Sequence, residues 1–275
     1  MIADLHVHSV YSDGLYSPDE ICRKAAARGI SLLSITDHDT LSGLEVKRQA
    51  ALRHGISYLS GWEVSAYAGA QKVHILGYGC QDGEAYRHFT ETRKAAAFER
   101  AKDSMEKFRA MGIPVSYQEV LDRRSAPDLP VHTMHIARAV APYLGITDGE
   151  VYREYLAIGK PANSNIGRPT PEQAIDCIHE AGGIASIAHP GRLEMTEEER
   201  EKTLKALLAY GADGIECFYT THTDKDTEYF LSLARETGAL VTGGSDTHYE
   251  EETHRIGNPC FTPDKRLLEA LKISL

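Results

Sequence analysis

The chain of 275 residues is long enough for one large α/β domain, or for such a domain with an insertion. Its 42% hydrophobic and 25% charged residues are typical of a globular protein, and its net charge of −10 argues against a broad contact with duplex nucleic acid. The five cysteines form no CxxC pair, which argues against a disulfide framework and a thiolate zinc site. Because no apolar run is long enough to span a bilayer and the chain starts directly with a predicted strand, we expect a cytoplasmic protein.

The first segment carries polar side chains at alternate positions. If residues 2–8 form a strand, Asp4, His6 and His8 share one face, because side chains alternate along a strand. Two imidazoles that point the same way can bind one divalent ion or two adjacent ions. The pair by itself also fits two ordinary hydrogen-bonded histidines.

Strands and helices alternate through the next segments. A capping box at residues 17–20 starts a helix, and the short strand that follows it ends just before His38. A second helix, at about 44–54, precedes extended segments that contain Glu63 and His74. Asp37 and Asp39 are ligands, partners that orient His38, or turn caps, and of these we favour the orienting role.

Residues 83–159 show helices and no convincing strand, so they interrupt the alternation. We expect residues 100–169 to form a helical insertion, or cap domain, within a main domain of residues 1–99 and 170–275.

The alternation then resumes. The strand at 184–188 ends at His189, and the last strand leads into Asp246 and His248. Alternating strands and helices predict a parallel sheet, and in barrels of this class the C-terminal strand ends meet at one mouth. The candidate ligands at these ends are six histidines and three carboxylates: His6, His8, Asp13, His38, Glu63, His74, His189, Asp246 and His248. This donor set suits two or three divalent ions of manganese, zinc or iron, which would favour an anionic substrate such as a phosphate ester.

At these motifs the chain resembles the polymerase and histidinol phosphatase (PHP) superfamily of metal-dependent phosphoesterases. The matching motifs are Asp4-Leu-His6-Val-His8-Ser9, Thr36-Asp37-His38-Asp39, the Glu63 and His74 positions, His189-Pro190-Gly191-Arg192 and Ser245-Asp246-Thr247-His248. The resemblance implies a distorted seven-stranded (β/α) barrel with a trinuclear site, and it implies metal-ligand roles for the nine residues above.

Within that superfamily the chain is most similar to short members that remove phosphate from nucleoside 3′,5′-bisphosphates and trim short RNA from the 5′ end. The match includes residues 214–217, and by this resemblance Arg192 and His222 hold the substrate phosphate, while His222 or a water protonates the leaving oxygen. The insertion departs from the pattern of these members, which tend to have Gly-Arg-Pro-His where this chain has His-Thr-Met-His at 132–135. His135 either contacts the substrate or only packs within the insertion, and we expect Lys160 to reach the mouth of the site.

The sequence therefore predicts a phosphoric ester hydrolase in which hydroxide formed at the metal attacks phosphorus. We expect a small phosphorylated substrate, a nucleotide or short oligonucleotide, and no duplex DNA, membrane or obligate protein partner. Two alternatives are a histidinol-phosphate-type phosphatase of small metabolites and a non-catalytic metal-binding regulatory module. A more remote one, a C–N hydrolase of the amidohydrolase type, expects a metal-bridging lysine on a later strand, and no predicted strand end offers one.

Overall fold

The computed structural model of the chain describes residues 1–69, 71–124, 127, 131–251 and 253–273. The chain divides into two compact units, one made of Met1–Arg87 and Pro169–Leu275 and the other of His88–Arg168. The first unit contains the sheets, and the second is helical. The helical unit begins earlier than the insertion that the sequence predicts, at His88 rather than at residue 100.

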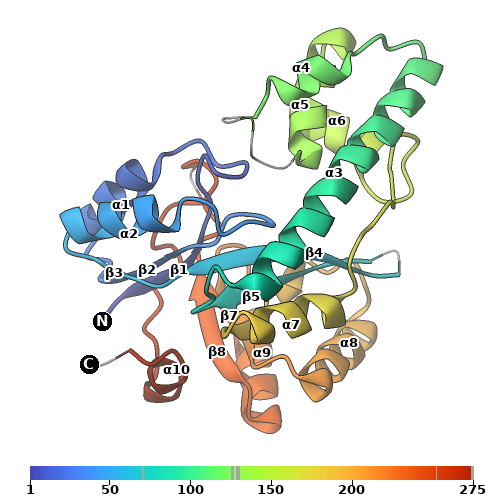
Figure 1. The fold of residues 1–275 in the computed structure, drawn as a ribbon. Coiled ribbons are helices and arrows are strands. Elements are labelled where there is room, and N and C mark those ends of the chain that lie inside the picture. Colours follow the sequence, from blue (N-terminus) through green and yellow to red (C-terminus); the bar gives the residue numbers. More distant parts are fainter. Residues whose placement is uncertain (70, 125–126, 128–130, 252, 274–275) are drawn as a thin grey trace. The chain divides into compact units, whose positions relative to one another are not determined.

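The described residues of the first unit form eight strands in two sheets (Figure 1). The smaller sheet is parallel and has the order β1 (Ala3–Val7), β2 (Leu32–Ile35) and β3 (Ser57–Tyr58). The larger sheet has the order β4 (Gly61–Ala68), β5 (Gln71–Tyr78), β6 (Ile184–Ile187), β7 (Gly214–Tyr219) and β8 (Leu240–Gly244). The pairs β4–β5 and β5–β6 are antiparallel, whereas β6–β7 and β7–β8 are parallel.

The prediction of an α/β fold is confirmed, but an all-parallel sheet was the wrong expectation for β4 and β5. Only two residues separate these strands in the chain. Such a short connection reverses the chain direction, because a parallel pair needs a crossover of a dozen or more residues.

Single residue pairs join the two sheets at two places. Val7 pairs with Thr247, beyond the end of β8, and His38, beyond the end of β2, pairs with Glu63 of β4. The backbone N–H of His8 donates to Thr247 O at 3.0 Å. The described strands therefore do not form the continuous seven-stranded barrel that the sequence predicts, because β2 and β8 end before these contacts and isolated bridges replace a ladder.

Helices flank both sheets. In the first unit, α1 (Pro18–Ala27) and α2 (Leu44–Arg53) pack on each other and on the small sheet (Figure 1). The larger sheet is covered by α7 (Pro171–Glu180) over β4–β6 and by α9 (Asp224–Thr237) over β7 and β8. The other helices of this unit are the 3₁₀ turn η2 (Pro190–Arg192), α8 (Glu197–Tyr210) and α10 (Lys265–Ala270).

Strand β1 shows why polar groups gather inside this unit. All five of its residues are buried. Leu5 and Val7 belong to the apolar core, yet Asp4 and His6 of the same strand are buried as well. Buried polar groups are costly unless they find partners, so the polar face of β1 must be satisfied within the fold.

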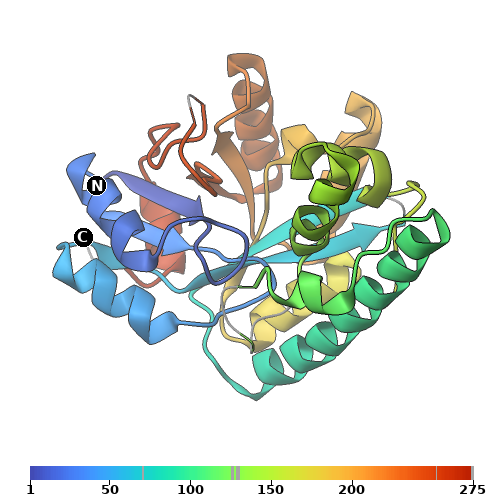
Figure 2. The ribbon, with the colours of Figure 1, turned by 90° about the horizontal axis from the view of Figure 1, so that it is seen from above.

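The helical unit has its own apolar core. It contains most of α3 (Glu84–Ala110), then α4 (Tyr117–Leu121), α5 (Thr133–Leu144), α6 (Asp148–Val151) and the π-helical turn η1 (Tyr152–Leu156). Figures 1 and 2 show α4, α5 and α6 gathered beside the C-terminal half of α3. Phe108, Val120 and Val140 are fully buried between these helices. Capping boxes begin α4 at Ser116 and α6 at Thr147.

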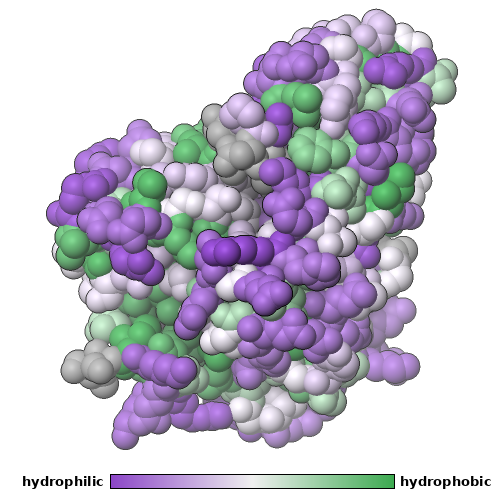
Figure 3. All heavy atoms as spheres, viewed as in Figure 1, coloured by the Kyte–Doolittle hydropathy of each residue, from purple (hydrophilic) through white to green (hydrophobic). Residues whose placement is uncertain are grey.

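Hydrophilic side chains cover most of the face drawn in Figure 3, as expected from a chain with 25% charged residues. Among the residues that the structure describes, no helix combines the length and the apolar character needed to cross a bilayer.

Candidate metal centre

The strand ends of the first unit bring the predicted ligands into linked groups. Within the described part of the chain there are three groups whose candidate donor atoms all lie within 4.8 Å of one another. They are His8, Asp13, His38 and His248; His6, His8, Glu63 and Asp246; and His38, Glu63 and His74. Because His8, His38 and Glu63 each belong to two groups, the three form one continuous cluster.

The ninth predicted ligand, His189, joins this cluster through two contacts. Its Nε2 atom lies 2.9 Å from Glu63 Oε1 and 3.1 Å from His74 Nδ1. All nine residues that the sequence singled out are therefore brought together, although they come from six separate stretches of the chain.

Strained backbone accompanies these strand ends. Asp39, His189 and Asp246 have positive φ angles of 54°, 26° and 51°, a region that residues other than glycine rarely adopt. Such strain persists only where surrounding contacts hold it, and it gathers at functional sites. Here the N–H of Asp246 donates to His6 O at 2.7 Å, and the N–H of His189 donates to Glu216 Oε2 at 2.6 Å.

Glu216 of β7 is a site residue whose role the sequence did not indicate. It is fully buried, and its Oε1 atom lies 2.9 Å from His6 Nδ1. A carboxylate only accepts hydrogen bonds, so Nδ1 of His6 carries the proton and Nε2 faces the cluster as the potential ligand atom. The sequence feature that could have pointed to Glu216 is that it is the one charged residue in an otherwise uncharged predicted strand.

A buried ion pair organises the loop that follows β1. The Lys47 ammonium lies 2.6 Å from Asp37 Oδ2, and both side chains are completely inaccessible. Asp37 also accepts hydrogen bonds from Ser9 N and Ser9 Oγ, both at 2.7 Å, and from Ser12 Oγ at 2.9 Å. Burial opposes ionisation of Asp37, but the Lys47 charge outweighs it and lowers the pKa of Asp37. Asp37 thus fixes the Ser9–Ser12 loop between His8 and Asp13, and its orientation of His38 stays a prediction.

The electrostatics of the cluster fit a bound cation. Burial disfavours charge on the imidazoles, yet the carboxylates Asp246 and Glu63 outweigh burial and raise the pKa of His8 to about 10. The pKa of His6 is also raised, against burial, by Glu216, Glu63 and Asp246. The carboxylates therefore favour positive charge at His6 and His8, which divalent ions would supply in place of protons, whereas burial lowers the pKa of His74.

Several donor atoms in the cluster also lack hydrogen bonds. Within the described part of the chain, the buried atoms His74 Nε2, Glu63 Oε2 and Asp246 Oδ1 make none, although Glu63 Oε2 lies 3.0 Å from His38 Nδ1 and Asp246 Oδ1 lies 3.1 Å from His8 Nε2. Buried polar atoms without hydrogen bonds call for an explanation, and coordination of an ion is the one that this nitrogen and oxygen set fits.

Arg192 and His222, the predicted phosphate-binding pair, both lie in the first unit. Nη1 of Arg192 donates to Tyr219 Oη at 3.0 Å and lies 3.3 Å from Asp246 Oδ2, yet the side chain is 56% exposed. His222 Nδ1 donates to Cys217 O at 3.0 Å, and His222 Nε2 accepts from Gly191 N at 3.1 Å. Burial lowers the pKa of His222, so the structure holds it as a neutral ring.

His135 and Lys160 lie in the helical unit. His135 is buried, and its Nδ1 atom accepts a hydrogen bond from His132 N at 3.1 Å, which closes the N-terminus of α5. Lys160 is exposed in a turn after η1. Their contact with a substrate stays a prediction.

The fold and the cluster together define a class of α/β proteins that present a histidine- and carboxylate-rich potential metal centre at their strand ends. The chain belongs to the PHP domain family, whose family model matches residues 4–126. The family prediction from the sequence is confirmed.

Relatives of known name extend the similarity over nearly the whole chain. The chain is 35% identical to the 3′,5′-nucleoside bisphosphate phosphatase of Chromobacterium violaceum, over 97% of this chain and 96% of that protein. It is 32% identical to a 5′-3′ exoribonuclease of Haemophilus influenzae, over 90% of this chain and 89% of that protein.

Two solved structures share the fold. One, described as an amidohydrolase from Chromobacterium violaceum with bound sulfate and no metal, has a TM-score of 0.85 and 33% identity over 98% of this chain and 96% of that one. Another, described as a metal-dependent phosphoesterase from Bifidobacterium adolescentis, has a TM-score of 0.84 and 26% identity over 98% of this chain and 96% of that one.

Proposed function

We propose that this protein is a metal-dependent phosphoesterase that hydrolyses phosphate monoesters of nucleoside 3′,5′-bisphosphates and 5′-nucleotides, and that also acts on short RNA from the 5′ end. The observation that carries the proposal is the linked cluster of nine nitrogen and oxygen donors at the strand ends. The named functions of the two relatives point to the same reaction class and to the same kind of substrate.

The cluster is suited to two or three divalent ions of manganese, zinc or iron. We propose that His6, His8, Glu63 and Asp246 hold one ion, and that the two groups sharing His38 hold the others. Divalent ions in such a site acidify water to give the nucleophile and neutralise charge on the phosphoryl oxygens. Glu63 and Asp246 supply the negative charge that retains the ions, and Glu216 orients His6.

Arg192 is the proposed phosphate-binding side chain. Its guanidinium is held beside the cluster by Tyr219 and Asp246, while more than half of the side chain stays exposed and open to a ligand. A guanidinium matches the oxygens of a phosphate group and stabilises charge that develops on them.

His222 is the second proposed phosphate contact and a candidate proton donor to the leaving oxygen. In the structure its Nε2 atom accepts a hydrogen bond from the Gly191 N–H. To contact the substrate, Nε2 has to give up this hydrogen bond and form one with the substrate instead. The lowered pKa of His222 means that it binds a proton only once negative charge arrives beside it, as a phosphate group would bring.

A parallel assay tests the proposed function. Phosphate release is measured from adenosine 3′,5′-bisphosphate, 5′-AMP, histidinol phosphate and a 5′-phosphorylated RNA oligomer, with manganese and then with zinc. We expect the bisphosphate or the oligomer to turn over fastest. Fastest turnover of histidinol phosphate would instead indicate a phosphatase of small metabolites, and no release from any of them would favour a regulatory metal-binding module.

The Asp246→Asn variant tests whether this cluster is the site of reaction. The change keeps the shape of the side chain and removes the charge beside His6 and His8, so we expect phosphate release to fall by at least about 100-fold. The exposed Asp224→Asn variant serves as a charge-matched control and should keep wild-type activity. Wild-type activity in Asp246→Asn would exclude the proposed site.

A further inference from the structure

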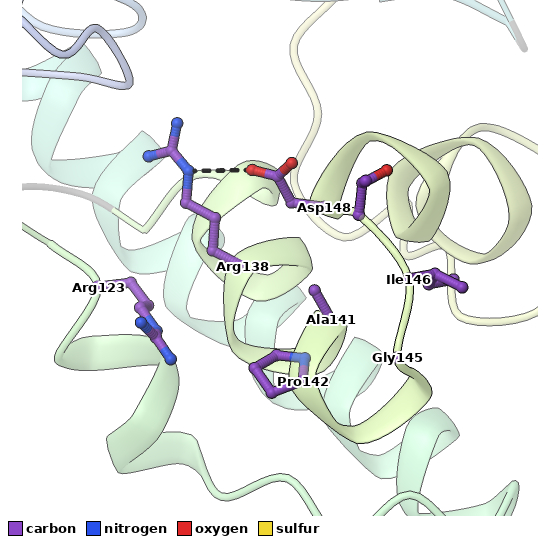
Figure 4. Close-up of a pocket in the computed structure, with 8 residues that line it drawn as sticks. Arg123, Arg138, Ala141, Pro142, Gly145, Ile146 and Asp148 are labelled. Carbon is purple, nitrogen blue, oxygen red and sulfur yellow. Dashed lines mark hydrogen bonds and ion pairs between the residues drawn. The ribbon is translucent and has the colours of Figure 1, made fainter.

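The helical unit contains a cavity of about 560 Å³ that includes none of the residues predicted for the metal centre. Its lining comes from Arg123 just after α4, from α5, from the connection between α5 and α6, and from the start of α6 (Figure 4). This volume lies within the roughly 300–1,000 Å³ that is typical of small-ligand sites.

Two arginines give the cavity a positive lining. Arg123 follows α4 and Arg138 lies on α5, and Figure 4 shows both side chains at the cavity. The only acidic lining residue among those described is Asp148, whose Oδ2 atom lies 3.4 Å from Arg138 Nε. Among the described lining residues two guanidinium groups face one carboxylate, and the donors of a guanidinium match the oxygens of a phosphate group.

The remaining wall offers apolar contact. Ala141 and Pro142 of α5 and Ile146 of the connection to α6 line the cavity beside the arginines. A nucleotide has both features that this lining would recognise, a phosphate group for the arginines and a base or sugar face for the apolar side chains.

Charge is distributed unevenly between the two units. Residues 88–168 contain twelve lysines and arginines against ten aspartates and glutamates, whereas the rest of the chain contains eighteen against thirty. The acidity of the protein therefore resides in the sheet-containing unit. An anionic strand is repelled by that unit outside its metal centre and finds its favourable field on the helical unit.

We propose that the cavity lined by Arg123 and Arg138 is a binding site for a phosphate-bearing nucleotide, and that the helical unit uses it to hold an oligoribonucleotide substrate. The inference rests on the proposed function for the identity of the strand. The proposed cavity site is separate from the chemistry at the metal centre. It gives the helical unit a role in the choice of substrate.

Fluorescence anisotropy of the metal-loaded full chain tests the site. Every protein compared carries Asp246→Asn, so that the probe, a labelled six-nucleotide strand with a 5′-phosphate, is not hydrolysed during the measurement. We expect the double variant Arg123→Gln/Arg138→Gln to weaken binding about tenfold or more. The slope of log affinity against log salt should become shallower by about 0.7 for each phosphate group that the variant no longer neutralises. Arg109→Gln, at an exposed arginine of α3 outside the cavity, is the matched control and should bind as the Asp246→Asn protein does.

The opposite charge change gives a second, independent readout. Asp148→Asn removes the only acidic lining residue described, so we expect it to tighten binding of the same probe several-fold. Because this variant gains affinity, its result is separable from loss of folded protein, which the thermal unfolding midpoint of each variant reports. Unchanged affinity and salt slope in the double variant, or no gain in Asp148→Asn, would overturn the inference.

Competition separates the two sources of the phosphate group. Adenosine 3′,5′-bisphosphate that displaces the probe from Asp246→Asn protein, and does so less well once Arg123→Gln/Arg138→Gln is added, would show that the cavity takes a free nucleotide. Displacement only by unlabelled strand would show that it takes the polymer. Turnover of the bisphosphate by the wild type judges the proposed function separately, so failure of the cavity and failure of the reaction are distinguishable.

Discussion

Glu216 determines which nitrogen of His6 is available at the metal centre. Its two oxygens are both used, one beside His6 Nδ1 at 2.9 Å and one accepting the His189 N–H at 2.6 Å. A single carboxylate on β7 thus orients two proposed ligands that arise from β1 and from the end of β6. Loss of a group that orients ligands in this way typically lowers metal affinity about 10- to 100-fold.

Substitution of Glu216 by glutamine tests this role. The amide keeps the size of the side chain but loses the charge and one of the two acceptor oxygens, so His6 and His189 lose a fixed partner. We expect the affinity for manganese, measured by titration calorimetry, to fall about 10- to 100-fold. Glu228→Gln, at an exposed position of α9, should leave the affinity unchanged. Equal affinities of the two variants would contradict the assigned role.

At the scale of elements, α2 fixes the loop after β1 through the Lys47–Asp37 pair. A buried charge whose partner is removed is left uncompensated, at a cost of about 3–5 kcal/mol, whereas removal of both charges is often tolerated. We therefore expect Lys47→Met to lower the free energy of unfolding by about that amount, measured by urea titration of metal-free protein. The double variant Asp37→Asn/Lys47→Met should recover most of the loss.

Two comparisons make the Lys47 result specific. Lys225→Met removes an exposed lysine that is 82% accessible and should change stability little. If the double variant were as unstable as Lys47→Met, the effect would come from packing rather than from an uncompensated charge.

The contact between α4 and α5 in the helical unit should depend on pH. Tyr143 Oη donates to Glu119 Oε1 at 2.6 Å, and this bond, with those from Ser116, lowers the pKa of Glu119 to about 2. A carboxylate with a lowered pKa stabilises the fold above its unfolded pKa of about 4.3, and this contribution is lost as the pH falls toward 2. We expect Tyr143→Phe to be less stable than the wild type at pH 6, with the difference disappearing by about pH 2.

Thermal unfolding between pH 6 and pH 2 measures this difference. Tyr152→Phe, in the same unit, is the control and should show no pH-dependent gap from the wild type. If the difference in stability between Tyr143→Phe and the wild type stays constant down to pH 2, the hydroxyl does not act through the Glu119 carboxylate.

For the whole molecule, bound metal should stabilise the sheet-containing unit. A ligand that binds only the folded state adds about 2.7 kcal/mol at a concentration 100 times its Kd. We expect chelation to lower the thermal unfolding midpoint and manganese or zinc to restore it, as followed by circular dichroism. Asp246→Asn protein should respond less, because it retains fewer charges at the cluster. A midpoint unaffected by chelation, in protein shown to have lost its metal, would contradict this prediction.

The sequence by itself determined the features that short stretches encode. The capping box at Ser17 is a local pattern and appears where it was expected. Most of the nine candidate ligands were visible because they lie at or just beyond strand ends, which meet in an α/β fold. Glu63 and His74 are exceptions, since Glu63 lies near the start of β4 and His74 lies within β5. The match to the PHP family depends on these same short motifs.

Only the tertiary structure decided which distant residues act together. His6 and Glu216 are 210 residues apart, so no local pattern links them, and the partner of Lys47 is likewise set by how α2 packs on the small sheet. The separation into two sheets follows from where β2 and β8 end, which depends on backbone contacts between distant segments. The hydrophobic periodicity of a sequence specifies which face of a helix or strand is buried. The partner of a buried charge depends on which elements pack against that face, and this is determined by the tertiary structure.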